Sequence, residues 1–208
     1  MVNEPEPSRH SSDAPAERIV DHRNRRLDAV STSTKWPRTR YAADLLFCAS
    51  EEELNAIARL PEPAGIGQPF ALWDRDWIER HLRCAQICLQ EAQLTSFSPS
   101  TRAGAAIDAA VHCALAAAGV EGVMLPVGLF AVALVWLSRL PALSETAQDG
   151  ACWLVDRHYK RMTLKSWEPT TEAHAATALT HAHGIYEETS GWIRTLSTNS
   201  ATPSGPPG

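Results

Sequence analysis

The fold is decided by residues 98–119, whose sequence is SPSTRAGAAIDAAVHCALAAAG. Ser98 is a favoured N-cap residue and Pro99 suits the first helical position, so a helix is expected to begin here. Alanine, the strongest helix former, dominates the interior as far as Gly119, a residue typical of C-terminal caps. The stretch therefore predicts a helix over about 99–118, against which other helices can pack closely.

Helical periodicity continues on both sides of this stretch. Over residues 74–94 the apolar positions step by four and three, as on one face of an α-helix: Ile78, Leu82, Ala85, Leu89 and Ala92. A similar stripe follows Thr170, the expected cap of the last helix, and it comprises Leu179, Ala182, Tyr186, Thr189, Ile193 and Leu196. Shorter helices are expected after Ser50, over about 126–140, and from Ser144 to Met162.

These patterns predict an all-α helical bundle of about five helices with disordered termini. The expected organisation is a disordered tail over 1–34, an N-terminal helix and loop over 35–72, the bundle over 73–196, and a second disordered tail over 197–208. The core is expected to contain Leu82, Leu89, Ile107, Val111, Leu115, Phe130, Leu134, Leu154, Leu179 and Ile193.

Composition limits the function and the compartment. The chain has 208 residues and a net charge of −5, which excludes a strongly basic nucleic-acid binder. Five cysteines, an odd number, follow an N-terminus without the apolar core of a signal peptide, so we expect reduced thiols and a cytoplasmic protein. The chain has no glycine-rich phosphate loop, and no cofactor is expected.

One apolar run leaves two alternatives open. Residues 122–137 contain no charge over 16 positions, whereas a membrane-spanning helix needs about 20 apolar residues. Because the run is short and contains Pro126, a buried core helix is favoured. A small membrane-associated protein remains the alternative.

Clusters of histidine and cysteine are candidates for metal binding and catalysis. His81, Cys84 and Cys88 share one helix face, but structural zinc needs four ligands, so no metal is expected. His112 and Cys113 are adjacent and point about 100° apart on a helix, so they are not expected to form a catalytic dyad. The last helix adds three further histidines, interpreted as part of a polar face: His174, His181 and His183.

The densest basic feature of the predicted bundle is the segment Arg157, His158, Lys160 and Arg161. It allows two interpretations. The four side chains form a patch that binds a phosphate-bearing partner, or they simply place cations at a helix C-terminus, where the helix dipole favours them.

Several segments resemble HEPN-like proteins, which are small bacterial helical bundles. The segments are LTSFSPSTR (residues 94–102), AAIDAAVHCAL (105–115), DRHYK (156–160) and the helix over 170–196, and the resemblance spans residues 73–196, roughly 60% of the chain. Many proteins of that family are metal-independent ribonucleases, often toxins beside an antitoxin, whose site pairs an Arg with a His a few residues later and is duplicated by dimerisation.

The resemblance implies that Arg157 is the matching Arg, but residues 162–164 are Met, Thr and Leu, so no His completes the pair. We therefore expect a non-catalytic HEPN-like interaction module that contacts RNA or a partner protein through Arg157, His158, Lys160 and Arg161, or that forms a homodimer. The alternative is a ribonuclease with an altered site, in which Arg157 and His158 are the candidate catalytic residues.

Overall fold

The structure is a computed structural model that describes residues 49–69, 72–126, 128–162 and 169–199. The chain divides into a unit of residues 1–36, which lies outside the described residues, and a unit of residues 37–208. Throughout the described ranges the regular structure is helical and contains no strand. The all-α prediction is therefore confirmed, whereas the predicted disorder of residues 1–34 concerns residues outside the described part.

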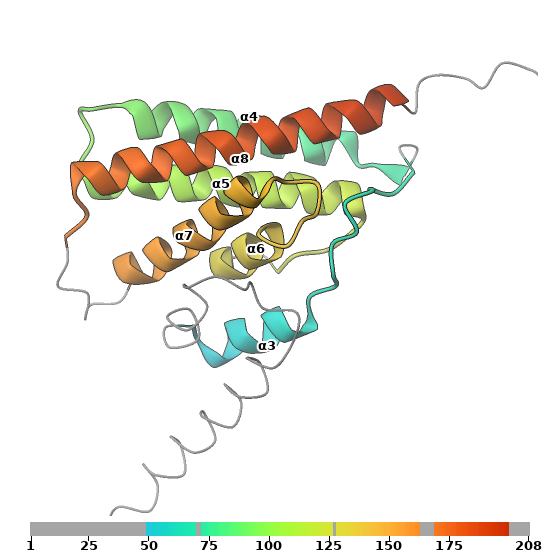
Figure 1. Cartoon of the computed structure of the whole chain (residues 1–208), viewed down its shortest axis with the longest axis horizontal. Coiled ribbons are helices and arrows are strands. Elements are labelled where there is room, and N and C mark those ends of the chain that lie inside the picture. Colours follow the sequence, from blue (N-terminus) through green and yellow to red (C-terminus); the bar gives the residue numbers. More distant parts are fainter. Residues whose placement is uncertain (1–48, 70–71, 127, 163–168, 200–208) are drawn as a thin grey trace, which may run out of the picture. The chain divides into compact units, whose positions relative to one another are not determined.

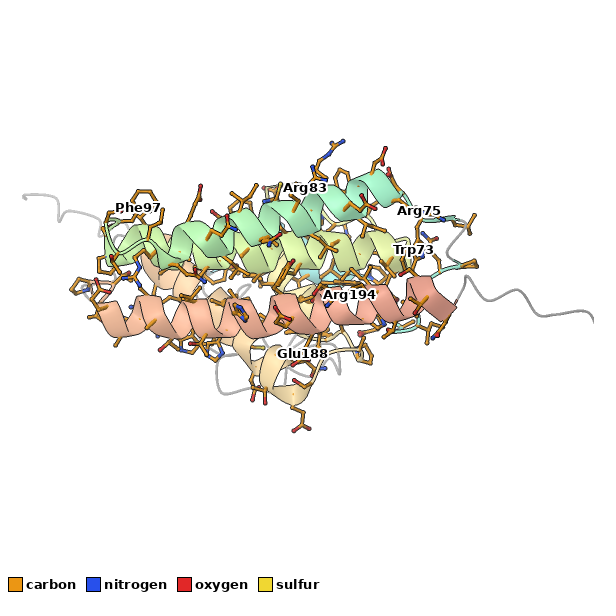
Figure 2. The ribbon with its side chains drawn as sticks, turned by 90° about the horizontal axis from the view of Figure 1, so that it is seen from above. Trp73, Arg75, Arg83, Phe97, Glu188 and Arg194 are labelled. Carbon is orange, nitrogen blue, oxygen red and sulfur yellow. The ribbon has the colours of Figure 1, made fainter. Side chains whose placement is uncertain are left out.

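Six helices are described: α3 (Glu51–Arg59), α4 (Arg75–Gln93), α5 (Pro99–Glu121), α6 (Phe130–Leu137), α7 (Glu145–Met162) and α8 (Glu172–Asn199). The three longest, α4, α5 and α8, lie alongside one another, as the view in Figure 2 shows. Helices α6 and α7 pack against α5 from another side (Figure 1). Helix α5 thus contacts four other helices and forms the centre of this unit.

The central helix begins as predicted and ends later. The Ser98 hydroxyl accepts a hydrogen bond from the Thr101 N–H at 3.2 Å, and Pro99 occupies the first turn. The cap predicted at Gly119 is wrong, because α5 continues to Glu121 and ends at Gly122, whose φ of 70° is left-handed. Gly119 serves close packing instead: a Cβ there would lie 3.2 Å from both Ile78 and Trp77, so its absence lets α4 approach.

The other helix starts follow local capping chemistry. Ser50 and Glu53 form the reciprocal hydrogen bonds of a capping box, and the Ser144 hydroxyl accepts from the Ala147 N–H at 3.2 Å. The cap of the last helix is shifted by one residue, because the hydroxyl that accepts from the His174 N–H belongs to Thr171. Helix α8 also runs through Asn199, past the point where the second tail was expected to begin.

The uncharged run of residues 122–137 forms only one short helix. Helix α6 has eight residues, which at 1.5 Å per residue gives about 12 Å, well short of the roughly 30 Å hydrocarbon core of a bilayer. All its residues after Phe130 are buried. Among the described helices, α5 is long and apolar enough to cross a membrane by length and composition alone, and it is mostly buried inside the unit.

The predicted core is partly confirmed. Six of its members are buried: Leu89, Ile107, Val111, Leu134, Leu154 and Ile193. Three are half-buried: Leu82, Leu115 and Leu179. The prediction for Phe130 is wrong, since this residue is 39% exposed. Phe130 and Leu115 are incompletely covered because both line a cavity.

A buried arginine joins three helices at one end of the unit. The Arg102 guanidinium donates to the Ala92 carbonyl at 3.0 Å and forms an ion pair of 2.6 Å with Glu172 at the start of α8. Arg102 belongs to the SPSTR segment that resembles HEPN-like proteins. Within this chain, the described contacts of Arg102 hold α4, α5 and α8 together.

Candidate ligand pocket

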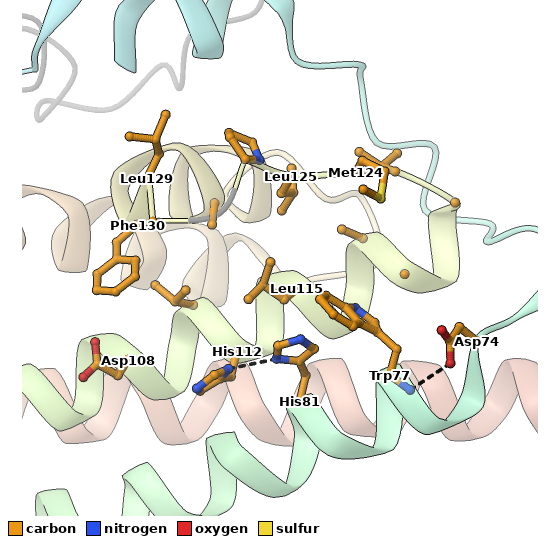
Figure 3. A pocket seen from close by; sticks show the side chains of 18 of the residues that line it. Asp74, Trp77, His81, Asp108, His112, Leu115, Met124, Leu125, Leu129 and Phe130 are labelled. Carbon is orange, nitrogen blue, oxygen red and sulfur yellow. Dashed lines mark hydrogen bonds between the residues drawn. The ribbon is translucent and has the colours of Figure 1, made fainter. Parts of the chain in front are cut away.

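A pocket of about 710 Å³ lies between α4, α5 and residues 122–126 and 128–133 (Figure 3). Its size falls within the range of small-molecule sites, which is roughly 300–1,000 Å³. Most of the lining is apolar and comes from three places. Trp77 projects from α4, Leu115 from α5, and Leu129 and Phe130 from the start of α6.

The backbone around the pocket is shaped by two glycines and one carboxylate. The left-handed Gly122 turns the chain at the end of α5. The preceding residue is Glu121, whose carboxylate accepts hydrogen bonds from the N–H groups of Ala64 and Gly67 at 2.8 and 2.9 Å. Gly67 has a φ of 66°, and a Cβ there would lie only 2.9 Å from Val120. The loop before α4 is thereby fixed against the end of α5 that borders the pocket.

Large apolar side chains gather at the rim of the pocket. Met124 is 95% exposed and Leu72 is 66% exposed, and Trp77 and Phe130 are each more than one third exposed. All four line the pocket. Single exposed apolar residues are ordinary on a protein surface, but a group of them around a cavity typically marks a binding site. The sequence alone did not indicate this group, because its members come from three separate segments.

Two histidines from different helices meet in the pocket wall. Nδ1 of His81 on α4 lies 2.9 Å from Nδ1 of His112 on α5, a hydrogen-bond distance (Figure 3). The Trp77 ring stands edge-on to His81, with ring centroids 4.3 Å apart. Nε2 of His81 is buried and has no hydrogen-bond partner within the described part of the chain. The pair therefore presents polar nitrogen atoms in an otherwise apolar wall.

The environment keeps both imidazoles neutral near pH 7. Burial lowers the pKa of His81, and the neighbouring His112 and Arg80 lower it further. Burial also lowers the pKa of His112, and the Asp108 carboxylate opposes this only in part. A neutral pair can hold its Nδ1–Nδ1 hydrogen bond only if one ring carries the proton on Nδ1 and the other does not.

The thiol in the pocket is not an activated nucleophile. Burial, followed by the charges of Asp108 and Glu91, raises the pKa of Cys88 to about 11. At neutral pH the sulfur is therefore protonated, and the thiolate is the reactive form. Among the described residues, no three His, Cys, Asp or Glu side chains come together as metal ligands. His81 pairs with His112 rather than with Cys84 and Cys88.

The described residues of the basic segment on α7 differ in exposure, since Arg157 is buried and Lys160 is exposed. Arg157 is only 4% exposed, and its guanidinium contacts Nδ1 of His174 near the start of α8. Lys160 forms an ion pair of 2.9 Å with the buried Asp156. His158 is half-buried, with its ring 5.9 Å from that of Phe130. The side chain of Arg161 lies outside the described residues.

The structure buries Arg157, one of the four residues of the predicted patch. The two cross-helix pairs, His81 with His112 and Arg157 with His174, were not predicted. Each joins two consecutive helices, across 31 and 17 residues respectively, and no spacing rule within one helix could indicate it.

Comparison with known proteins adds no relative: no family model, no curated protein and no solved structure matches this chain. The resemblance to HEPN-like proteins accordingly stays a prediction.

Proposed function

We propose that this chain is a non-catalytic helical binding module that takes a small apolar molecule in the pocket between α4, α5 and residues 122–126 and 128–133. The observation that carries the proposal is the cavity of about 710 Å³ with apolar walls and an exposed apolar rim. Transfer of an apolar ligand into such a site is favoured by about 25 cal/mol for each Å² removed from water.

Binding is favoured over catalysis because the pocket offers few reactive groups. Cys88 is the one thiol among the described residues that line it, and burial keeps that thiol protonated. Lysine and arginine are absent from the described residues that line the pocket. The polar groups that are present, above all His81 and His112, suit the orientation of a ligand by hydrogen bonding.

The proposal is tested by titration with N-phenyl-1-naphthylamine, an uncharged apolar probe whose fluorescence rises when it leaves water. We expect saturable binding to the parent chain. Leu115→Trp adds an indole inside the pocket and is expected to weaken binding at least about tenfold, which is about 1.4 kcal/mol.

A matched control adds the same indole elsewhere. Ile87 lies exposed on α4 and does not line the pocket, so Ile87→Trp should bind the probe as the parent does. Thermal melting of both variants verifies that they fold. If the parent does not bind, or if Leu115→Trp folds and binds as well as the parent, the proposal is refuted.

Ribonuclease activity remains a second candidate because of one observation. Arg157 contacts His174 near the start of the last helix, which is where the resemblance to HEPN-like proteins implies a catalytic Arg and His. In this ribonuclease candidate, Arg157 acts together with His174 rather than with His158. An RNA-cleavage assay with the parent, His174→Ala and the exposed control His183→Ala decides it. If the parent and His183→Ala cleave RNA and His174→Ala does not, the ribonuclease candidate is supported. If the parent does not cleave RNA, the ribonuclease candidate is rejected.

A further inference from the structure

We infer that the ligand of the pocket is one unbranched alkyl chain of about 16 carbons, lying lengthwise between α4 and α5, as a single-chain amphiphile provides. This inference rests on the proposed function, because it names the ligand class of the same pocket. The shape of the pocket carries it, since the described lining is long, narrow and largely apolar.

The floor of the pocket is made of two antiparallel helices. At one end, a Cβ on Gly119 of α5 would lie 3.2 Å from Trp77 of α4. At the other end, the Asp108 carboxylate of α5 is close enough to Cys88 of α4 for its charge to raise the pKa of the thiol. The histidine pair joins the two helices between these points. Residue numbers thus rise along α4 as they fall along α5, and both helices follow the pocket from end to end.

The length of the pocket follows from the residues that line this floor. On α4 the lining extends from the capping residue Asp74 to Cys88, and on α5 it extends from Asp108 to Gly122. Either stretch contains 14 steps of the helix, which at 1.5 Å per residue rise about 21 Å. An extended alkyl chain advances by about 1.3 Å per carbon, because its bonds of about 1.5 Å are inclined to its axis. A chain of about 16 carbons therefore matches the floor in length.

A third wall follows the floor over the same length. Figure 3 shows Met124 at the end of the pocket that contains Asp74, and Phe130 at the end that contains Asp108. This wall is held at its beginning by the Val123 N–H, which donates to the carbonyl of the α5 helix at Ala118 at 2.8 Å. The three walls together form a channel rather than a round cavity.

The width of the pocket suits one alkyl chain. Over a length of about 21 Å, the volume of about 710 Å³ gives a mean cross-section of about 34 Å², which is a width of about 6–7 Å. A methylene chain is about 4 Å wide, the separation that packed carbon atoms keep, so two chains side by side would need about 8 Å. An α-helix with its side chains is about 10–12 Å across and does not fit.

The wall rewards each methylene that enters. Trp77, Leu115 and Phe130 supply apolar surface along the pocket. His81 and His112 bond each other through Nδ1, so a chain that passes them interrupts no hydrogen bond. Each methylene removed from water is expected to raise affinity by up to about fourfold, until the chain is as long as the pocket.

The test uses N,N-dimethylalkylamine N-oxides, amphiphiles without net charge at pH 7.5 whose chain length varies while the head group stays the same. Dissociation constants are measured by equilibrium dialysis for chains of about 8 to 18 carbons, each below the concentration at which it forms micelles. For the parent we expect affinity to rise about two- to fourfold with each methylene and to level off at about 16 carbons.

Two neighbouring residues of α4 provide matched variants. Cys88 lines one end of the pocket, whereas Ile87 is exposed and does not line it. In Cys88→Trp the indole fills about one helical turn of that end, about 5.4 Å, so affinity should level off at about 12 carbons while the shortest chains bind as they do to the parent. Ile87→Trp should give the profile of the parent.

Leu115→Trp provides a second variant in case Cys88→Trp does not fold, which thermal melting shows. Leu115 lies midway between Asp108 and Gly122, so its indole should limit the gain in affinity to about 8 carbons.

The outcomes separate this inference from the proposed function. Suppose that N-phenyl-1-naphthylamine binds the parent and that Leu115→Trp weakens this binding. If the amine oxides then do not bind, if their affinity does not depend on chain length, or if the folded Cys88→Trp weakens all chain lengths equally, the alkyl-chain inference is refuted and the proposed function survives. If N-phenyl-1-naphthylamine does not bind the parent, the proposed function itself fails.

Discussion

Truncation of Leu134 tests whether α6 lies in the core as described. Leu134 is 0% exposed, so Leu134→Ala removes a fully buried side chain and leaves a cavity. Such truncations cost about 2–5 kcal/mol. For a chain of this size each kcal/mol lowers the melting temperature by about 2–4 °C, so we expect a decrease of about 4–20 °C by calorimetry.

Phe130 on the same helix provides the matched comparison. Its ring is 39% exposed and faces the open pocket, so Phe130→Ala forfeits only part of the roughly 1.5–3 kcal/mol of a fully buried side chain and creates no sealed cavity. The decrease in melting temperature should therefore be clearly smaller than for Leu134→Ala. Equal decreases, or an unchanged melting temperature in Leu134→Ala, would contradict the described orientation of α6.

Two further predictions concern the loop before α4 and the histidine pair. Glu121→Ala removes the acceptor of the Ala64 and Gly67 N–H groups, so the free energy of unfolding in urea should fall by about 1–3 kcal/mol. Amide exchange in the loop before α4 should also become faster. Unchanged exchange would contradict the anchoring role of Glu121. Because burial lowers the pKa of His81 and His112, the unfolded chain binds protons near pH 6.5 while the folded chain does not. Their contribution to stability is therefore present above that pH and is lost as the pH falls through the lowered pKa values. The melting temperature should decrease on acidification from pH 7.5 to 5, and less steeply in His81→Phe; identical slopes would exclude the pair as a cause.

Helix starts were predictable from the sequence because capping is local. A hydroxyl at the cap, such as that of Ser98 or Ser144, bonds to an N–H three residues later, and both partners are visible in one short segment. The end of α5 was less predictable. Gly119 and Gly122 are both plausible caps from the sequence alone. In the structure α4 packs against Gly119, which lies inside the helix, and Gly122 ends it.

Most of the candidate pocket and the two cross-helix pairs could not be predicted from the sequence. Helix α6 is apolar all round, so its periodicity does not indicate that Phe130 faces a pocket while Leu134 faces the core. The pairing of His81 with His112 depends on how α4 and α5 are rotated about their axes. Charged side chains are usually exposed, so the sequence does not indicate the burial of Arg157 against His174, which depends on the position of α8.

Ligand binding in the pocket is tested most directly by methyl NMR of methionine. The chain has three methionines, at positions 1, 124 and 162, and Met124 lines the pocket. In a sample labelled at the methionine methyl groups, titration with N-phenyl-1-naphthylamine should shift the Met124 resonance, which is identified by its absence from Met124→Leu. A saturating titration in which the Met124 resonance does not move would contradict the account.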